Sequence, residues 1–99
     1  GVVAAAQAAG ATTIGIANNP DTALLKASSY PILIATGGEI IAGSTRLKAG
    51  TSQKICLNLI SSIIMTKMGF VTNGMMSSMV PTNNKLRRRR EQIDAALRK

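Results

Sequence analysis

The sequence has 99 residues, 45% of them hydrophobic, which suits one small folded domain. Twelve Lys and Arg against four Asp and Glu give a net charge of +8, and histidine is absent. A single cysteine excludes an intramolecular disulfide, and the lack of histidine excludes a Cys/His metal or catalytic pair. The sequence has only two aromatic residues, Tyr30 and Phe70, so base stacking on aromatic side chains is not expected. Cys56 lies among aliphatic residues and is predicted to be a buried core thiol, and we expect a cytoplasmic protein without metal or other cofactor.

The first third of the chain predicts alternating helices and strands. An Ala-rich helix ends at Gly10, and Thr12–Ala17 is a β-branched run typical of a buried parallel strand. Asp21 or Thr22 caps a short helix, Ala23–Ser28, and Tyr30–Thr36 is a second apolar strand. This order predicts an α/β fold with a right-handed crossover and a parallel sheet. The sequence starts without a polar lead-in, and we expect it to begin inside a larger domain.

A long helix is predicted from about Ser44 to about Met68, where Gly69 ends it. Apolar residues cover most of its circumference from Ile55 onward, so it is predicted to be a core helix or a subunit-interface helix at a homodimer contact. The apolar run is shorter than the roughly 20 residues of a bilayer crossing, and no membrane association is expected.

The last part of the chain predicts an adaptable, methionine-rich segment and a basic helix. Asn73 and Gly74 mark a turn, and Pro81 breaks the chain before the caps of a final helix, Lys85–Lys99. The narrow apolar stripe of that helix is predicted to dock on the domain; it comprises Leu86, Ile93 and Leu97.

The positive charge is concentrated at this end. Residues 85–99 hold seven cations and two anions, which is +5 of the total +8. The run Arg87–Arg90 is compatible with non-specific contacts to nucleic-acid phosphates. No second basic stripe or aromatic residue accompanies it, so a nucleic-acid partner is not predicted. The pattern favours a solvated helix face that pairs with acidic residues of a partner surface or of another part of the protein.

The candidate site is the segment Gly37–Lys54, after the second strand, because ligands of parallel α/β sheets bind at the carboxyl ends of the strands. Ser44 or Thr45 is predicted to cap the long helix, whose free N–H groups, with Arg46 and Lys48, should attract an anion. Glu39 is expected to accept bonds from sugar hydroxyls or to pair with Arg46. The alternative is a capping arrangement with a surface ion pair.

Two further side chains, Asn18 and Asn19, follow the first strand at the same edge of the sheet. They offer polar contacts to a ligand, or serve as turn residues before Pro20 and Asp21.

The segment GGEIIAGSTRLKAGTSQK resembles the signature of the N-acetylmuramic acid 6-phosphate etherase and glucokinase regulatory protein family, which is built on the sugar isomerase (SIS) fold. TTIGIANNPDTALLKAS and PTNNKLRRR are also similar to the etherases, so the resemblance covers nearly the whole chain. A more distant similarity to the isomerase domain of glucosamine-6-phosphate synthase implies that Ala42 and Ser44 line a sugar-phosphate pocket. The chain departs from the family pattern at Ser77 and Ser78, where an acidic or polar residue is usual soon after the methionine pair.

The resemblance implies the C-terminal part of a flavodoxin-like SIS domain at residues 1–72, followed by a connection and helical extension at residues 73–99. It implies a phosphorylated amino sugar as ligand and cleavage of the D-lactyl ether of N-acetylmuramic acid 6-phosphate. The implied binding residues are Glu39, Ala42, Ser44, Thr45, Arg46 and Lys48.

No catalytic residue is assigned. The family's acid/base glutamates and phosphate loop lie upstream of the segment matched here, so the 99-residue chain alone is predicted to be inactive. The alternative function is a non-catalytic module that senses a sugar phosphate.

Overall fold

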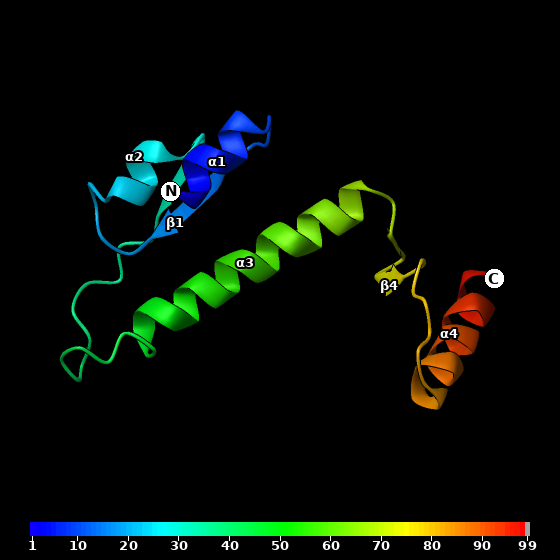
Figure 1. Cartoon of the computed structure of the whole chain (residues 1–99). Helices are drawn as coiled ribbons and strands as arrows, with labels where there is room; N and C mark the ends of the chain where they lie inside the picture. Colours follow the sequence, from blue (N-terminus) through cyan, green and yellow to red (C-terminus); the bar gives the residue numbers. More distant parts are fainter. Residues whose placement is uncertain (99) are drawn as a thin grey trace. The chain divides into compact units, whose positions relative to one another are not determined.

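The computed structural model describes residues 1–98, which form two compact units (Figure 1). The first is Gly1–Leu57, and the second begins at Asn58, within the long helix α3 (Lys48–Lys67).

The first unit contains the parallel sheet that the sequence predicts. Its elements follow in the order α1 (Val2–Ala8), β1 (Ile14–Ala17), α2 (Ala23–Ala27) and β2 (Tyr30–Leu33). The two strands pair in parallel, with Ile14 opposite Tyr30 and Ala17 opposite Leu33. Helix α2 packs against both strands and also contacts α1 (Figure 1).

Local chemistry accounts for the ends of these elements. Gly10 adopts a left-handed φ of 82° after α1, and the Thr22 hydroxyl accepts a bond from the Leu25 N–H at 3.3 Å at the start of α2. Both predicted strands were too long, because β1 begins at Ile14 and not at Thr12, and β2 ends at Leu33 and not at Thr36. Since β1 turns away after Ala17, residues beyond Ile34 have no partner strand.

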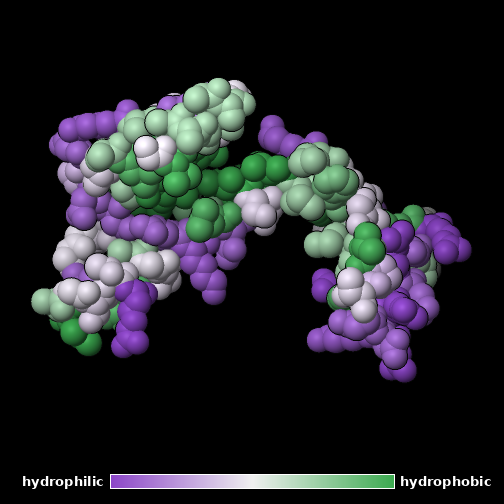
Figure 2. Space-filling view, viewed as in Figure 1, coloured by the Kyte–Doolittle hydropathy of each residue, from purple (hydrophilic) through white to green (hydrophobic). Residues whose placement is uncertain are grey.

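The described residues enclose little core. The buried apolar side chains are Ala17 in the first unit and Met79 and Ile93 in the second. No residue of α3 is buried, so within the described chain α3 is not the core helix that its apolar pattern predicted. Figure 2 shows hydrophobic surface along this helix. Cys56 was predicted to be a buried core thiol, but in the structure it is half-buried.

In the second unit, a hairpin connects α3 to the last helix. Strands β3 (Val71–Thr72) and β4 (Met75–Met76) pair antiparallel around Asn73 and Gly74, whose φ angles are 50° and 73°. Two successive positive φ angles at Asn-Gly match the tight turns that connect two-residue hairpins. The sequence analysis placed the turn but missed the hairpin.

The last helix, α4 (Asn84–Leu97), starts one residue before the predicted Lys85 and ends at Leu97, with Arg98 as its C-cap. The predicted last residue, Lys99, lies outside the described residues. The Asn83 side chain caps it by accepting a bond from the Leu86 N–H at 2.9 Å. Ile93 is buried, with an exposed fraction of 6%, and Leu86 and Leu97 are half-buried. The predicted apolar stripe is therefore largely covered within the described chain.

Within residues 1–98, no helix combines the length and the apolar character that spanning a membrane requires.

Candidate functional site

The long helix begins four residues later than the sequence predicted. Gly43 has a left-handed φ of 79°, and residues 44–47 form turns in which the Ser44 N–H donates to Ile41 O and the Leu47 N–H donates to Ser44 O. Helix α3 therefore starts at Lys48, and neither Ser44 nor Thr45 is its cap.

A carboxylate takes the capping role instead. The Lys48 N–H donates to Glu39 Oε2 and the Ala49 N–H donates to Glu39 Oε1, each at 2.9 Å. The next two N–H groups bond to backbone carbonyls, Gly50 to Thr45 and Thr51 to Leu47. All four N–H groups of the first helical turn are thus satisfied, and the helix start already holds an internal anion.

This arrangement decides between the predicted roles of Glu39 in the described chain. Its two oxygens bind the helix N-terminus, and no ion pair joins it to Arg46 among residues 1–98. The alternative of a capping arrangement is therefore correct, but the capping residue is Glu39. The surface ion pair expected with it is absent from residues 1–98.

The pKa of the Glu39 carboxyl lies below its ordinary value. The largest cause is the hydrogen bond from the Ala49 N–H, the next is the bond from the Lys48 N–H, and the positive charge of Lys48 adds a smaller effect. A lowered pKa in the folded state means that the carboxylate stabilises the fold above the unfolded-state pKa of about 4.3. This contribution is lost as the pH falls from there through the lowered folded-state pKa.

We predict that Glu39→Ala exposes the Lys48 and Ala49 amides, because it removes both acceptors. Their hydrogen exchange should become roughly tenfold faster near neutral pH. As the pH falls below about 4, the exchange protection of the original protein should converge on that of the variant. Equal exchange in both proteins at neutral pH would rule out the cap. Ile40→Ala, at an exposed neighbouring side chain, is the control.

A second polar junction ties the strand ends to α3. Asn18 follows β1 directly, and its Nδ2 donates to Ile34 O at 3.0 Å and to Ser52 Oγ at 3.1 Å. Its Oδ1 accepts a bond from Gln53 Nε2. One half-buried side chain thereby links β1, the end of β2 and the second turn of α3. Asn18 is therefore a tertiary contact and more than a turn residue.

A cleft of about 350 Å³ opens beside this junction. It lies where the carboxyl end of β1, the loop after it and the first turns of α3 meet, which is where α/β folds bind ligands. The cleft is lined by Ile16, Ala17, Asn18, Asn19, Thr22, Thr45, Ala49, Gly50 and Gln53.

Comparison with known proteins gives a consistent result. The chain is 48% identical over 93 residues to the N-acetylmuramic acid 6-phosphate etherase of Deinococcus radiodurans, covering 94% of this chain and 30% of that enzyme. It is 44% identical over 95 residues to the etherase of Streptomyces coelicolor, covering 96% of this chain and 30% of that enzyme. For the etherase of Halalkalibacterium halodurans the identity is 43% over 93 residues, covering 94% of this chain and 31% of that enzyme.

The chain is related to the N-acetylmuramic acid 6-phosphate etherases. The resemblance noted in the sequence is thereby confirmed. The chain spans about 30% of the length of these relatives and matches a C-terminal portion of them. No family model matches the chain.

Of the six binding residues predicted for this relative of the etherases, one lines the cleft. Thr45 lines it, together with Asn18 and Asn19, which the sequence analysis placed at the same edge. The other predicted residues lie on the loop before α3 or at its first position and do not line the cleft; they are Glu39, Ala42, Ser44, Arg46 and Lys48.

Sequence reasoning missed the contribution of Gln53 and Ser52. The side of α3 that reaches Asn18 carries Ser52 and Gln53. No local signal identifies them, because their partner, Asn18, is 34 and 35 residues away in the chain.

No group of three or more His, Cys, Asp or Glu side chains comes together among residues 1–98 in a way that would hold a metal ion.

Proposed function

We propose that this chain is part of an enzyme that cleaves the D-lactyl ether of N-acetylmuramic acid 6-phosphate to N-acetylglucosamine 6-phosphate and D-lactate. The observation that carries the proposal is the 48% identity to the Deinococcus radiodurans etherase over 93 residues. The relatives above share that name, so the regulatory alternative gains no support. On this proposal the protein acts in the cytoplasm, in the recycling of cell-wall amino sugars.

The phosphorylated amino sugar binds, on this proposal, at the carboxyl edge of the sheet. Thr45 contributes from inside the cleft, and the loop before α3 contributes the Ser44 hydroxyl, the Ala42 backbone and the charge of Arg46. Lys48, the first residue of α3, contributes a second charge. The cations suit a phosphate group.

Glu39 has a double role in this proposal. Its oxygens accept the two amide bonds at the start of α3, and each retains a lone pair that can accept a bond from a sugar hydroxyl. The carboxylate thus fixes the loop that carries Ser44 and Arg46 while it faces the ligand.

The surrounding fold is proposed to be a SIS domain. Two parallel strands alone leave their outer edges unpaired, and parallel sheets are ordinarily covered on both faces. The large apolar side chains of α3 are about half exposed, for example Ile55 at 55% and Ile63 at 53%. Both observations support further strands beside β1 and β2, and a homodimer contact along α3.

The chain by itself lacks a pair of carboxylates for acid and base roles at the site. Glu39 is the one acidic side chain there, and its oxygens bind the start of α3. We therefore predict that the purified 99-residue chain releases no D-lactate from N-acetylmuramic acid 6-phosphate.

The test of the proposal is a chimera in which this chain replaces the matching segment of the Deinococcus radiodurans etherase. The chimera should release D-lactate. Ser44→Ala combined with Lys48→Ala should then raise KM about tenfold or more, since a hydroxyl and a cation for the phosphate are lost.

Ser62→Ala with Lys67→Ala, on the far end of α3, is the matched control and should leave KM unchanged. A chimera with native circular dichroism but without D-lactate release would refute the function. An active chimera whose KM is insensitive to the Ser44 and Lys48 substitutions would refute the site and leave the function standing.

A further inference from the structure

The arginine run of α4 divides into residues with different surroundings. Arg90 Nε donates to both Asp94 oxygens at 2.9 Å, and its Nη1 donates to Met79 O at 2.6 Å. Arg90 is thus a structural side chain that holds α4 to the segment before it. Among residues 1–98, no ion pair is found for Lys85, Arg88 or Arg89.

These cations lie on adjoining parts of the surface of α4, which we call the basic face. It comprises Asn84, Lys85, Arg88, Arg89 and Gln92, at positions i, i+1, i+4, i+5 and i+8. Its residues are exposed and line a hollow of about 620 Å³. The apolar stripe with the buried Ile93 occupies the opposite side of α4. Figure 2 shows this helix as a strongly hydrophilic surface.

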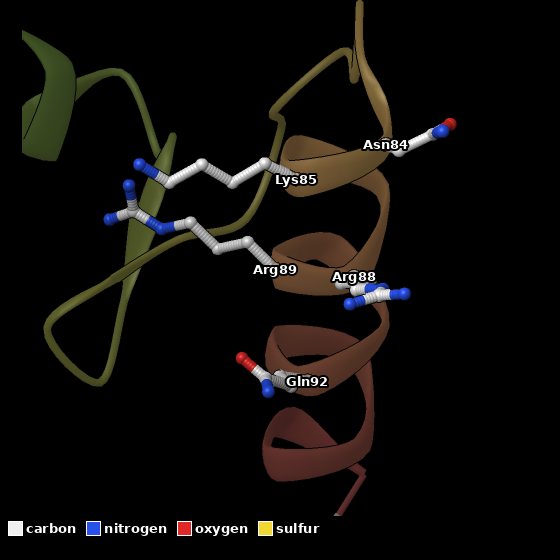
Figure 3. Close-up of a pocket in the computed structure, with 5 residues that line it drawn as sticks. All are labelled: Asn84, Lys85, Arg88, Arg89 and Gln92. Atoms are coloured by element: carbon white, nitrogen blue, oxygen red, sulfur yellow. The ribbon is translucent and has the colours of Figure 1, made fainter.

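The geometry of the basic face concentrates positive potential. Figure 3 shows Lys85 and Arg89 extending from successive turns in the same direction, with Gln92 one turn further along and Arg88 pointing away from these two. No acidic residue lies in the first turn of α4, so the positive end of the helix dipole adds to these charges. Like charges at i, i+4 repel, and an anionic partner would relieve that repulsion.

We propose that the basic face binds an acidic polypeptide segment on a partner protein. Carboxylates spaced by one helical turn match the spacing of Lys85 and Arg89, and Arg can hold a carboxylate through two parallel bonds. The side-chain amides of Asn84 and Gln92, at the two ends of the face, can bond to both the backbone and the carboxylates of such a segment.

A second copy of this chain does not fit the basic face. Of its four acidic residues, Asp21 faces Lys26 at 4.0 Å, Glu39 caps α3 and Asp94 binds Arg90. The remaining one, Glu91, lies on α4 itself. Residues 1–98 therefore present no acidic surface complementary to the basic face of a second copy.

A nucleic acid fits less well than an acidic polypeptide. The three cations cover about two turns of one helix, and residues 71–99 contain no aromatic side chain on which a base could stack. Phosphate-backbone binding draws on a longer track of cations.

The test uses the 99-residue chain and a fluorescent Ala-rich peptide with Glu at i and i+4 in successive turns, followed by anisotropy at low salt. We expect the peptide to bind, and its counterpart with Gln in place of Glu not to bind. Lys85→Gln with Arg89→Gln should weaken binding about tenfold or more, because both paired cations are lost. Gln preserves helix propensity, so α4 should remain folded, which circular dichroism checks.

The matched control is Lys54→Gln with Lys67→Gln, which changes the net charge equally at exposed positions of α3. Binding should change less than about twofold in this control. Equal weakening in both variants would show that net charge alone attracts the peptide and would overturn the proposal. If a short DNA duplex instead bound more tightly than the Glu peptide and lost that binding in the Lys85→Gln, Arg89→Gln variant, the result would overturn the proposal in favour of a nucleic-acid partner.

Discussion

Gly15→Ala is expected to loosen the junction of β1 and α2 more than alanine at any other glycine of the first unit would. A β-carbon at position 15 would overlap Ser28 Oγ and would lie 2.8 Å from Ser28 Cβ and 3.0 Å from Leu24 O. Leu24 O belongs to the helix backbone and accepts bonds from both the Ser28 N–H and its hydroxyl. The methyl group therefore displaces helix α2 from the sheet.

Overpacking of this kind costs about 2 kcal/mol, which corresponds to roughly 30-fold faster opening of the strand pair. Hydrogen exchange of two amides that bridge the strands measures it: the Tyr30 N–H bonds to Thr13 O at 2.9 Å, and the Ile34 N–H bonds to Ala17 O at 2.8 Å.

Gly38→Ala is the matched control, because no atom lies within 4 Å of a β-carbon there and its φ is not left-handed. It should leave exchange at the strand pair unchanged. Adding Ser28→Gly to Gly15→Ala removes the two closest contacts and should restore part of the protection. No acceleration with Gly15→Ala, or no recovery with Ser28→Gly, would show that α2 and β1 are not in this contact.

The second large effect is expected at Asn18. Asn18→Ala removes the bonds to Ile34 O and Ser52 Oγ and leaves the Gln53 side chain without its acceptor. Unsatisfied half-buried polar groups of this kind cost about 2 kcal/mol in total. The consequence is that the second turn of α3 detaches from the strand ends and the cleft at the candidate site opens.

The exchange of the Ile34 and Thr51 amides measures this loss, and both should exchange roughly 30-fold faster. Asn19→Ala is the control, because Asn19 is the exposed neighbour and its side chain makes no hydrogen bond within the described residues. Its effect should be within about 0.5 kcal/mol. If both alanine variants behaved alike, Asn18 would be a turn residue only, as one interpretation of the sequence had it.

Much of the site's position could be predicted before the structure. The β-branched run that ends at Ala17 and the turn residues after it place Asn18 at the carboxyl edge of a parallel sheet, and the structure confirms this placement. The order of strands and helices determines that edge, since parallel pairing brings successive strand ends together. Thr45, which was predicted as a helix cap and as a binding residue, lines the cleft although it does not cap α3.

The residues that complete the cleft could not be predicted in the same way. The helix start at Lys48 depends on Glu39, nine residues earlier, reaching back to two backbone amides, and no local propensity encodes that contact. The angular order of residues within α3 does not depend on where the helix starts, and Gln53 was missed because its partner, Asn18, lies 35 residues away in the chain.

The sequence by itself determined the order of the elements in the first unit, the parallel pairing of β1 with β2, the presence of capping residues just before α2 and α4, and the resemblance to the etherases. Each depends on local propensity or on residue identity, which the chain carries directly. Only the tertiary structure decided which side chain caps α3, which side of that helix contacts Asn18 and which arginine of α4 is held by hydrogen bonds. Those outcomes depend on contacts between residues that are not neighbours in the sequence. Sequence spacing allows several partners for each side chain, and the distance between the side chains and the direction in which they point select one of them.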